Sequence, residues 1–211
     1  MKKFMLIILV LFLLPALAVF AGGKQEKEEM EEKAGTEEER AAAEGETRQL
    51  RVTFAWPTYI DPAVGSDFSS SSTFVNLYDT LVYPTPDGGV KPNVAERWET
   101  SEDGLTWTFY LRDDVTFHDG SKLTADDVAF TMDRLVEIGE GYGYMFSGKV
   151  KSTEALDDYT VQFKLAEPYG PFLVTLVRLY ILNEDLVMAN IKEDGPYEEK
   201  GDYGKEWLLT N

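Results

Sequence analysis

The chain has 211 residues, of which 44% are apolar and 13% aromatic, enough for at least one packed core. It carries 38 acidic and 20 basic residues, a formal net charge of −18, which excludes nucleic acid and anionic membranes as partners because both attract cationic surfaces. It has no cysteine, which excludes disulfides, thiolate metal sites, thiol nucleophiles and the usual bacterial lipid anchor.

The first 21 residues have the layout of a secretory signal. Two lysines precede the apolar run Phe4–Leu14. The residues Val19-Phe20-Ala21, which are small or compatible with signal-peptide cleavage, precede a cleavage point ahead of Gly22. We therefore predict a signal peptide over residues 1–21 and a location in the periplasm or elsewhere outside the cytoplasmic membrane. An uncleaved membrane anchor is the alternative, although the apolar stretch is short for a spanning helix and contains Pro15.

The next segment, Gly22–Arg48, differs sharply in composition. It holds ten glutamates and no aromatic residue, so it cannot bury enough surface to offset the entropy of ordering. We predict an acidic disordered linker over residues 22–48, with a binding role for this tract as the alternative. The globular part is then residues 49–211.

Local patterns predict the first elements of the globular part. Apolar and polar residues alternate over Leu50–Ala55, which predicts a strand. The segment Asp67–Ser72 is small and polar, and apolar residues at helical spacing from Phe74 to Leu81 then predict a helix with Ser72 or Thr73 as its cap.

The middle of the chain carries a hairpin signal. The turn Ser101–Gly104 separates two strand-like runs, Trp98–Thr100 and Leu105–Arg112, and the second run alternates apolar residues on one face. A short strand is predicted at Val115–Phe117. Further on, Thr124 and Asp127 resemble a capping box at the start of an amphipathic helix.

Mixed strands and helices without an internal repeat indicate an α/β or α+β domain. The remaining predicted elements are a loop at Gly139–Gly148, a strand at Thr160–Leu165, a helix around Phe172–Leu179 and a last helix from Asn183 through Ile191.

Ordered motifs across Ala95–Thr131 carry a resemblance to a known family. They are Ala95-Glu96-Arg97-Trp98, Ser101-Glu102-Asp103-Gly104, Thr106-Trp107-Thr108-Phe109, Val115-Thr116-Phe117-His118-Asp119-Gly120 and Leu123-Thr124-Ala125-Asp126-Asp127-Val128. This region resembles the bacterial extracellular solute-binding proteins of family 5, the oligopeptide, dipeptide and nickel type. Weaker similarity covers the rest of the globular part.

The resemblance implies a fold and an organisation. The expected fold is α/β, like a type II periplasmic binding protein, with a first lobe that contains an inserted α+β subdomain at about residues 83–181. Because family members are far longer, it also implies that the chain is incomplete and represents the N-terminal part of the family domain.

Several conspicuous residues have structural explanations. His118 is the only histidine, and without a second histidine or any cysteine it lacks the companions that a catalytic pair or a zinc or nickel site needs, so we assign it to a turn. Trp98 and Trp107 lie in the apolar alternation and are predicted to be core. No metal site and no cofactor is expected.

Candidate ligand-binding residues lie in the irregular segments. In the family, the segment around Asp67, Phe68, Ser69, Ser70 and Ser71 faces the cleft, and free N–H groups at a helix start can hold a ligand carboxylate or carbonyl. The aromatic residues Trp56, Tyr59, Tyr142 and Tyr144 could pack on ligand side chains. For the segment from Asp67 to Ser71, the alternative is an ordinary capped loop. For the loop that carries Tyr142 and Tyr144, the alternative is a loop folded onto its own subdomain.

The resemblance implies a transport function without catalysis. We expect a monomer that captures di- or oligopeptides between two lobes and delivers them to the permease and ATPase subunits of an ABC importer. Family members that bind oligosaccharides or nickel are the alternatives. A secreted hydrolase that uses paired carboxylates, or a nonfunctional fragment, is the remaining possibility.

Overall fold

A computed structural model describes residues 55–210. The predicted signal peptide, the predicted linker and all but the last residue of the predicted strand Leu50–Ala55 lie outside the described residues. Within the described part, no helix is both long and apolar enough to cross a membrane.

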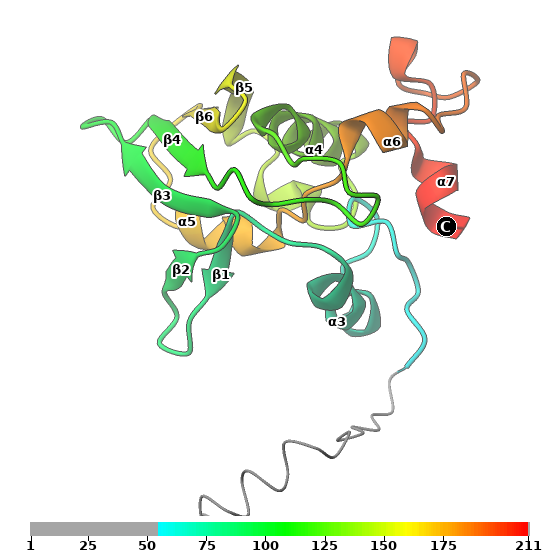
Figure 1. The fold of residues 1–211 in the computed structure, drawn as a ribbon, viewed down its shortest axis with the longest axis horizontal. Coiled ribbons are helices and arrows are strands. Elements are labelled where there is room, and N and C mark those ends of the chain that lie inside the picture. Colours follow the sequence, from blue (N-terminus) through cyan, green and yellow to red (C-terminus); the bar gives the residue numbers. More distant parts are fainter. Residues whose placement is uncertain (1–54, 211) are drawn as a thin grey trace, which may run out of the picture. The chain divides into compact units, whose positions relative to one another are not determined.

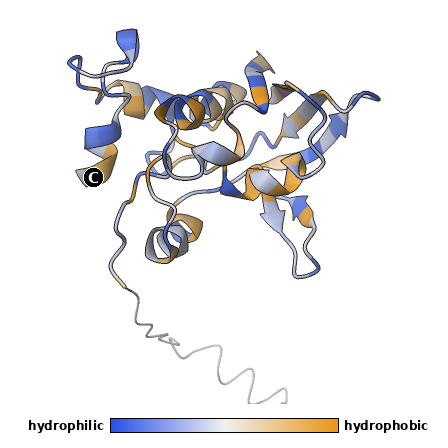
Figure 2. Ribbon diagram, turned by 180° about the vertical axis from the view of Figure 1, so that it is seen from behind, coloured by the Kyte–Doolittle hydropathy of each residue, from blue (hydrophilic) through white to orange (hydrophobic). Residues whose placement is uncertain are grey.

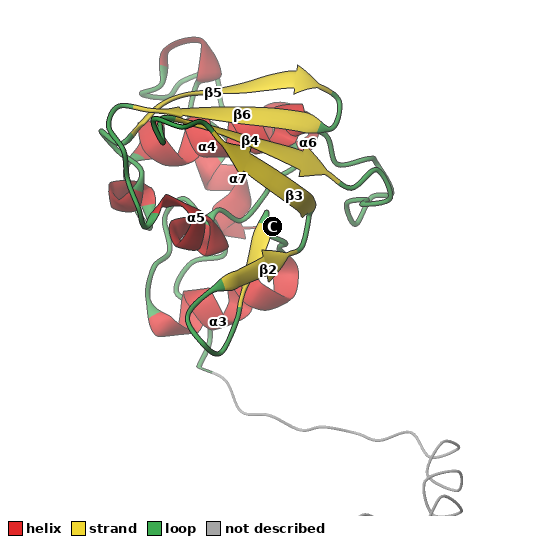
Figure 3. Ribbon diagram, turned by 90° about the vertical axis from the view of Figure 1, so that its left-hand side faces the viewer, coloured by secondary structure: helices red, strands yellow, loops and turns green. Residues whose placement is uncertain are grey.

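A four-stranded antiparallel sheet forms one layer of the fold. Its strands are β3 (Ala95–Thr100), β4 (Thr106–Leu111), β6 (Thr160–Leu165) and β5 (Val150–Asp157), in that spatial order (Figure 3). The predicted hairpin is confirmed, because β3 pairs with β4 across the turn at Ser101–Gly104. Its tip is hydrophilic (Figure 2), whereas Phe109 in its second arm is fully buried.

Helix α4 (Ala125–Ile138) packs against β5 and β6 of this sheet (Figure 1). The predicted capping box is confirmed: the Thr124 backbone N–H donates to Asp127 Oδ2 at 2.8 Å, and Gly139 ends the helix in the left-handed conformation at φ 68°. Aromatic rings of the sheet and of the segment near residue 172 pack together in the core. The ring centroid of Phe163 lies 5.5 Å from that of Phe109 and 5.6 Å from that of Phe172.

A second group of elements lies beyond the four-stranded sheet. It comprises helix α3 (Phe68–Leu77) and the two-stranded sheet of β1 (Val82–Pro84) and β2 (Val90–Pro92). Helix α5 (Phe172–Thr175), which is hydrophobic along its length (Figure 2), continues into the 3₁₀ helix η2 (Leu176–Arg178). A single bridge between Thr80 and Tyr180 connects these segments.

The C-terminal elements are short. They are α6 (Glu184–Met188), the 3₁₀ helix η3 (Glu198–Lys200) and α7 (Lys205–Thr210). Earlier in the chain, the 3₁₀ helix η1 (Gly143–Met145) lies within the loop that follows α4. The predicted Asn183 cap is confirmed, because its side chain accepts from the Leu186 N–H at 2.9 Å. This helix ends before Ile191, and it is followed by α7, so it is not the last.

Two other predicted elements need correction. Helix α3 begins at Phe68, and its N-cap is Asp67, not Ser72 or Thr73, because the Asp67 carboxylate accepts from the first N–H groups of the helix. Val115–Phe117 is not a strand. It forms only an isolated bridge between Thr116 and Lys122, on the return arm of its own turn.

A buried ion pair joins segments that are distant in the sequence. The Arg134 guanidinium on α4 donates to both carboxylate oxygens of Asp61, at 2.8 and 2.7 Å, and both side chains are at most 1% exposed. The same guanidinium donates through Nε to the Tyr203 carbonyl oxygen at 2.7 Å. Asp61 Oδ1 also accepts from the Ala63 N–H at 2.9 Å, so both charges are fully hydrogen-bonded.

Replacing Arg134 with methionine is expected to lower the free energy of unfolding by about 3–5 kcal/mol, because Asp61 stays buried without a partner. Equilibrium urea unfolding measures this loss. Arg112→Met, which removes an exposed pair with Asp114, is the matched control and should change stability little. The double variant Asp61→Leu/Arg134→Met should lose less than Arg134→Met alone, and equal losses in Arg134→Met and Arg112→Met would contradict the assignment.

Candidate functional site

The serine-rich start of α3 is capped by its own chain. Asp67 Oδ1 accepts from the N–H groups of Ser69 and Ser70 at 2.9 and 3.0 Å, and Asp67 Oδ2 accepts from Ser70 Oγ at 2.6 Å. The Ser70 hydroxyl is the main cause that lowers the pKa of Asp67. These two N–H groups are therefore already bonded, and any ligand contact in this segment falls to side chains.

The five residues of this segment face in different directions. Ser70 is buried, and its Oγ accepts from the Tyr59 backbone N–H at 3.0 Å. This hydrogen bond connects the loop that carries Tyr59 to α3. Phe68 is 86% exposed. Ser71 is half-buried and points toward Tyr142.

The structure brings Ser71 and Tyr142 together across 71 positions of sequence. Ser71 Oγ and the Tyr142 hydroxyl lie 2.7 Å apart, and the Tyr142 hydroxyl also donates to the Ser66 carbonyl oxygen at 3.3 Å. Each hydroxyl can donate and accept, so this pair can reorganise around a polar solute. The two predicted regions thus meet at one place.

Glycines on either side of Tyr142 make this meeting possible. A Cβ atom at Gly141 would lie 2.9 Å from the Ala63 carbonyl oxygen, and one at Gly143 would lie 2.7 Å from the Leu135 carbonyl oxygen. Both distances are too short for any other residue without a backbone shift. The loop after α4 therefore approaches Ala63 closely enough for Tyr142 to reach α3.

Arg178 completes this cluster and was not among the predicted site residues. Its guanidinium carbon lies 4.9 Å from the centroid of the Tyr142 ring, and its Nη1 donates to the Tyr180 hydroxyl at 3.4 Å. The available signal in the sequence is a single cation inside the apolar run Phe172–Leu179. We call Ser71, Tyr142, Arg178 and Tyr180 the serine–tyrosine–arginine cluster.

The other predicted aromatic residues are exposed to different degrees. Trp56 is 91% exposed and Tyr144 is 66% exposed, while Tyr59 is partly covered. Single exposed rings are common on protein surfaces, so exposure by itself assigns these residues no role.

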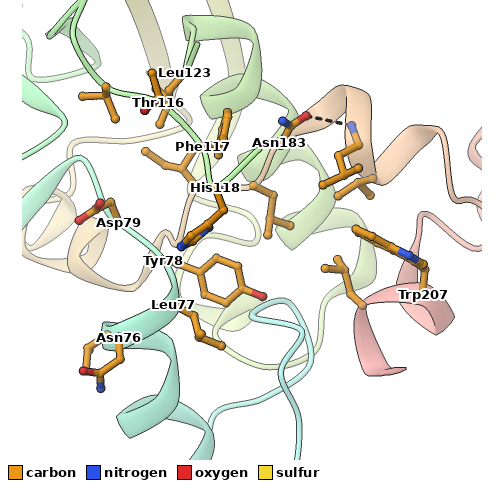
Figure 4. A pocket seen from close by; sticks show the side chains of 17 residues that line it. Asn76, Leu77, Tyr78, Asp79, Thr116, Phe117, His118, Leu123, Asn183 and Trp207 are labelled. Atoms are coloured by element: carbon orange, nitrogen blue, oxygen red, sulfur yellow. Dashed lines mark hydrogen bonds between the residues drawn. The ribbon is translucent and has the colours of Figure 1, made fainter. Parts of the chain in front are cut away.

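A larger cavity lies elsewhere, between the C-terminal end of α3, the loop around His118, α6 and α7. It has a volume of about 360 Å³, and Tyr78 and His118 stand on one side of it with Trp207 on the other (Figure 4). Burial raises the pKa of Tyr78 to about 12, so its hydroxyl stays neutral near pH 7. None of the predicted ligand-binding residues lines this cavity.

The structure also bears on metal binding. Among residues 55–210 there is no group of three histidine, cysteine, aspartate or glutamate side chains that could hold a metal ion. His118 lies on an exposed turn between Phe117 and Gly120, which agrees with a turn position.

Residues 89–208, more than half of the chain, match the family model of the bacterial extracellular solute-binding proteins, family 5 Middle. The chain belongs to this family. Its fold is accordingly that of a type II periplasmic binding protein, of which the described residues form a part.

Relatives of known name support this assignment. The chain is 37% identical over 145 residues to the probable D,D-dipeptide-binding periplasmic protein DdpA of Escherichia coli, which covers 65% of this chain and 28% of that protein. It is 32% identical over 128 residues to the nickel-binding periplasmic protein of E. coli, covering 59% of this chain and 24% of that protein. The matched region thus spans about a quarter of these relatives' length.

A solved structure agrees with the sequence relatives. The periplasmic binding protein DppA of Helicobacter pylori, in complex with the peptide STSA, superposes with a TM-score of 0.56 at 34% identity. The match covers 64% of this chain and 30% of that one.

The stability contributed by the Asp67 cap is expected to depend on pH. Because the folded-state pKa lies below the unfolded value of about 4, this contribution is present above pH 4 and is lost as the pH falls through the folded pKa. Asp67→Ala should therefore be destabilised relative to the parent chain at pH 7, and the difference should shrink toward pH 2. Urea unfolding at both pH values measures it, with Asp67→Asn, which can still cap, as the control. A difference that grows on acidification would contradict the capping role.

Proposed function

We propose that this chain is part of a substrate-binding component of an ABC importer that captures di- or oligopeptides outside the cytoplasmic membrane. Membership of family 5 supports a solute-binding role, and the relatives named as dipeptide-binding favour peptides. In this proposal residues 1–21 are the signal peptide, 22–48 are a linker, and a subdomain at about residues 83–181 is inserted into the first lobe.

The observation that carries the proposal is the serine–tyrosine–arginine cluster. A peptide presents N–H and C=O groups along its backbone, and hydroxyls such as those of Ser71 and Tyr142 can pair with either kind. Trp56 and Phe68 offer apolar surface to variable side chains without fixing one shape. Such a surface suits a solute class with a constant backbone and varied substituents.

The mechanism that we propose is capture by closure. A solute that contacts this lobe and a second lobe together favours the closed form by the difference in its affinity for the two states. The closed form then docks on a membrane permease whose ATPase subunits drive import. The chain acts as a monomer and changes no covalent bond of the solute.

One buried carboxylate of the described part, that of Asp127, has a structural role. Burial raises the pKa of Asp127, as it does for many catalytic acids, but both oxygens of this carboxylate are already used. Oδ1 accepts from the Glu184 N–H at 2.9 Å, and Oδ2 accepts from the Thr124 N–H at 2.8 Å. Asp127 therefore fastens α6 to the start of α4 and is not free to act as an acid.

Oligosaccharides and chelated nickel remain the alternatives within the family. Exposed Trp56 and Tyr144 are suited to stacking on sugar faces, and one of the relatives is named as nickel-binding. One set of binding measurements separates these ligand classes.

We expect a tripeptide, but neither an oligosaccharide nor nickel–histidine, to raise the melting temperature of the full chain and to give saturation-transfer NMR signals. Tyr142→Phe keeps the ring but removes the hydroxyl, so peptide affinity should fall about 2- to 10-fold, the usual worth of one hydrogen bond.

Tyr83→Phe, on the exposed face of β1, is the matched control and should leave peptide binding unchanged. Stabilisation by the oligosaccharide alone would replace the peptide assignment. Turnover of a chromogenic glycoside that disappears with one carboxylate substitution would refute the binding-only function.

A further inference from the structure

Arg178 differs from the other arginines of the described residues. Arg97, Arg112 and Arg134 each form an ion pair with a carboxylate, at 2.8, 2.9 and 2.7 Å. Within residues 55–210, Arg178 has no such partner; its contacts are the Tyr142 ring and the Tyr180 hydroxyl. In a chain with a net charge of −18, an arginine without a carboxylate is an exception that calls for an explanation.

The surroundings hold this guanidinium in place without satisfying it. A guanidinium has five N–H donors in a planar fork, and here one of them makes a single long hydrogen bond of 3.4 Å. The Tyr142 ring lies against it, and the Tyr142 hydroxyl is itself fixed by Ser71 at 2.7 Å. Arg178 is only half-buried, and among residues 55–210 no other hydrogen bond of its guanidinium is found.

We infer that Arg178 binds a carboxylate of the solute, which for a peptide is its C-terminal group. This inference rests on the proposed function and names the chemistry of one end of the ligand. A carboxylate has two oxygens with the spacing of the guanidinium fork, so the pair is bidentate and fixes orientation as well as charge. Tyr142 and Ser71 act as positioning residues that hold the fork.

The acidic surface gives this contact its selectivity. The net charge of −18 repels anions at long range, so a carboxylate gains from this chain only through direct contact with a cation. A neutral analogue loses that contact, and the long-range repulsion that it escapes is screened by salt and therefore weaker than a direct ion pair. The inference therefore predicts discrimination between a free peptide acid and its C-terminal amide.

The first experiment does not require a peptide. In the full chain, the Nε–Hε NMR signal of Arg178, assigned by its loss in Arg178→Lys, is followed during titration with acetate and with acetamide. A saturable shift with acetate, and none with acetamide, is expected. The Arg112 signal is the internal control, because this side chain is already paired with Asp114. No shift of the Arg178 signal with acetate would overturn the inference.

The second experiment compares trialanine with trialanine amide by saturation-transfer NMR. Arg178→Gln should weaken binding of the free acid at least ~10-fold, the loss typical of a charge-assisted hydrogen bond, and leave the amide unchanged. Arg178→Lys keeps the positive charge but not the planar fork, so its affinity for the free acid should lie between those of the parent chain and of Arg178→Gln. Arg112→Gln should have no effect.

The outcomes separate the inference from the proposed function. If acid and amide bind equally well to the parent chain, peptides are ligands but Arg178 does not bind their carboxylate. If neither peptide binds while acetate still shifts the Arg178 signal, the carboxylate site stands and the peptide assignment fails. Should Arg178→Gln unfold, as circular dichroism would reveal, the Arg178→Lys comparison between acid and amide decides.

Discussion

The ion pair between Asp61 and Arg134 is the contact on which the rest of the structure depends. It fixes the loop that carries Asp61 to α4. The Nε–H of the same guanidinium donates to the Tyr203 carbonyl oxygen, so three segments that are distant in the sequence meet at one buried charge. Asp61 also holds the Ala63 N–H, and Gly141 packs directly against the Ala63 carbonyl. The position of the loop that carries Tyr142 therefore follows from a contact that is buried away from solvent.

This arrangement explains how an acidic chain can present a cationic contact. Most basic side chains that pair in the described part do so with nearby carboxylates on the surface, where they are screened and contribute little. Arg178 instead lies on an aromatic ring, which stabilises the cation without neutralising it. A charge kept in this way remains available for an external anion.

The cavity beside α3, α6 and α7 and the serine–tyrosine–arginine cluster have different characters. The cavity of about 360 Å³ around Tyr78, His118 and Trp207 is the roomier, and its size is within the roughly 300–1,000 Å³ usual for ligand pockets. Its lining mixes apolar side chains, such as Leu77 and Leu186, with polar ones, such as Asn76, His118 and Asn183 (Figure 4). In the serine–tyrosine–arginine cluster the hydroxyls and the guanidinium gather at one place, an arrangement that ligand pockets use for specificity.

The sequence by itself determined the features that depend on neighbours a few residues apart. These are the β3–β4 hairpin, the Thr124–Asp127 capping box and the Asn183 cap, since each is closed by a hydrogen bond within a short stretch of chain. The start of α3 was misplaced because serines are weak helix formers and the apolar spacing begins only at Phe74. Only the tertiary structure decided that Asp61 meets Arg134, that Ser71 meets Tyr142 and that Tyr142 meets Arg178. These pairs are 73, 71 and 36 positions apart, and no local pattern encodes which distant side chain fills a given space.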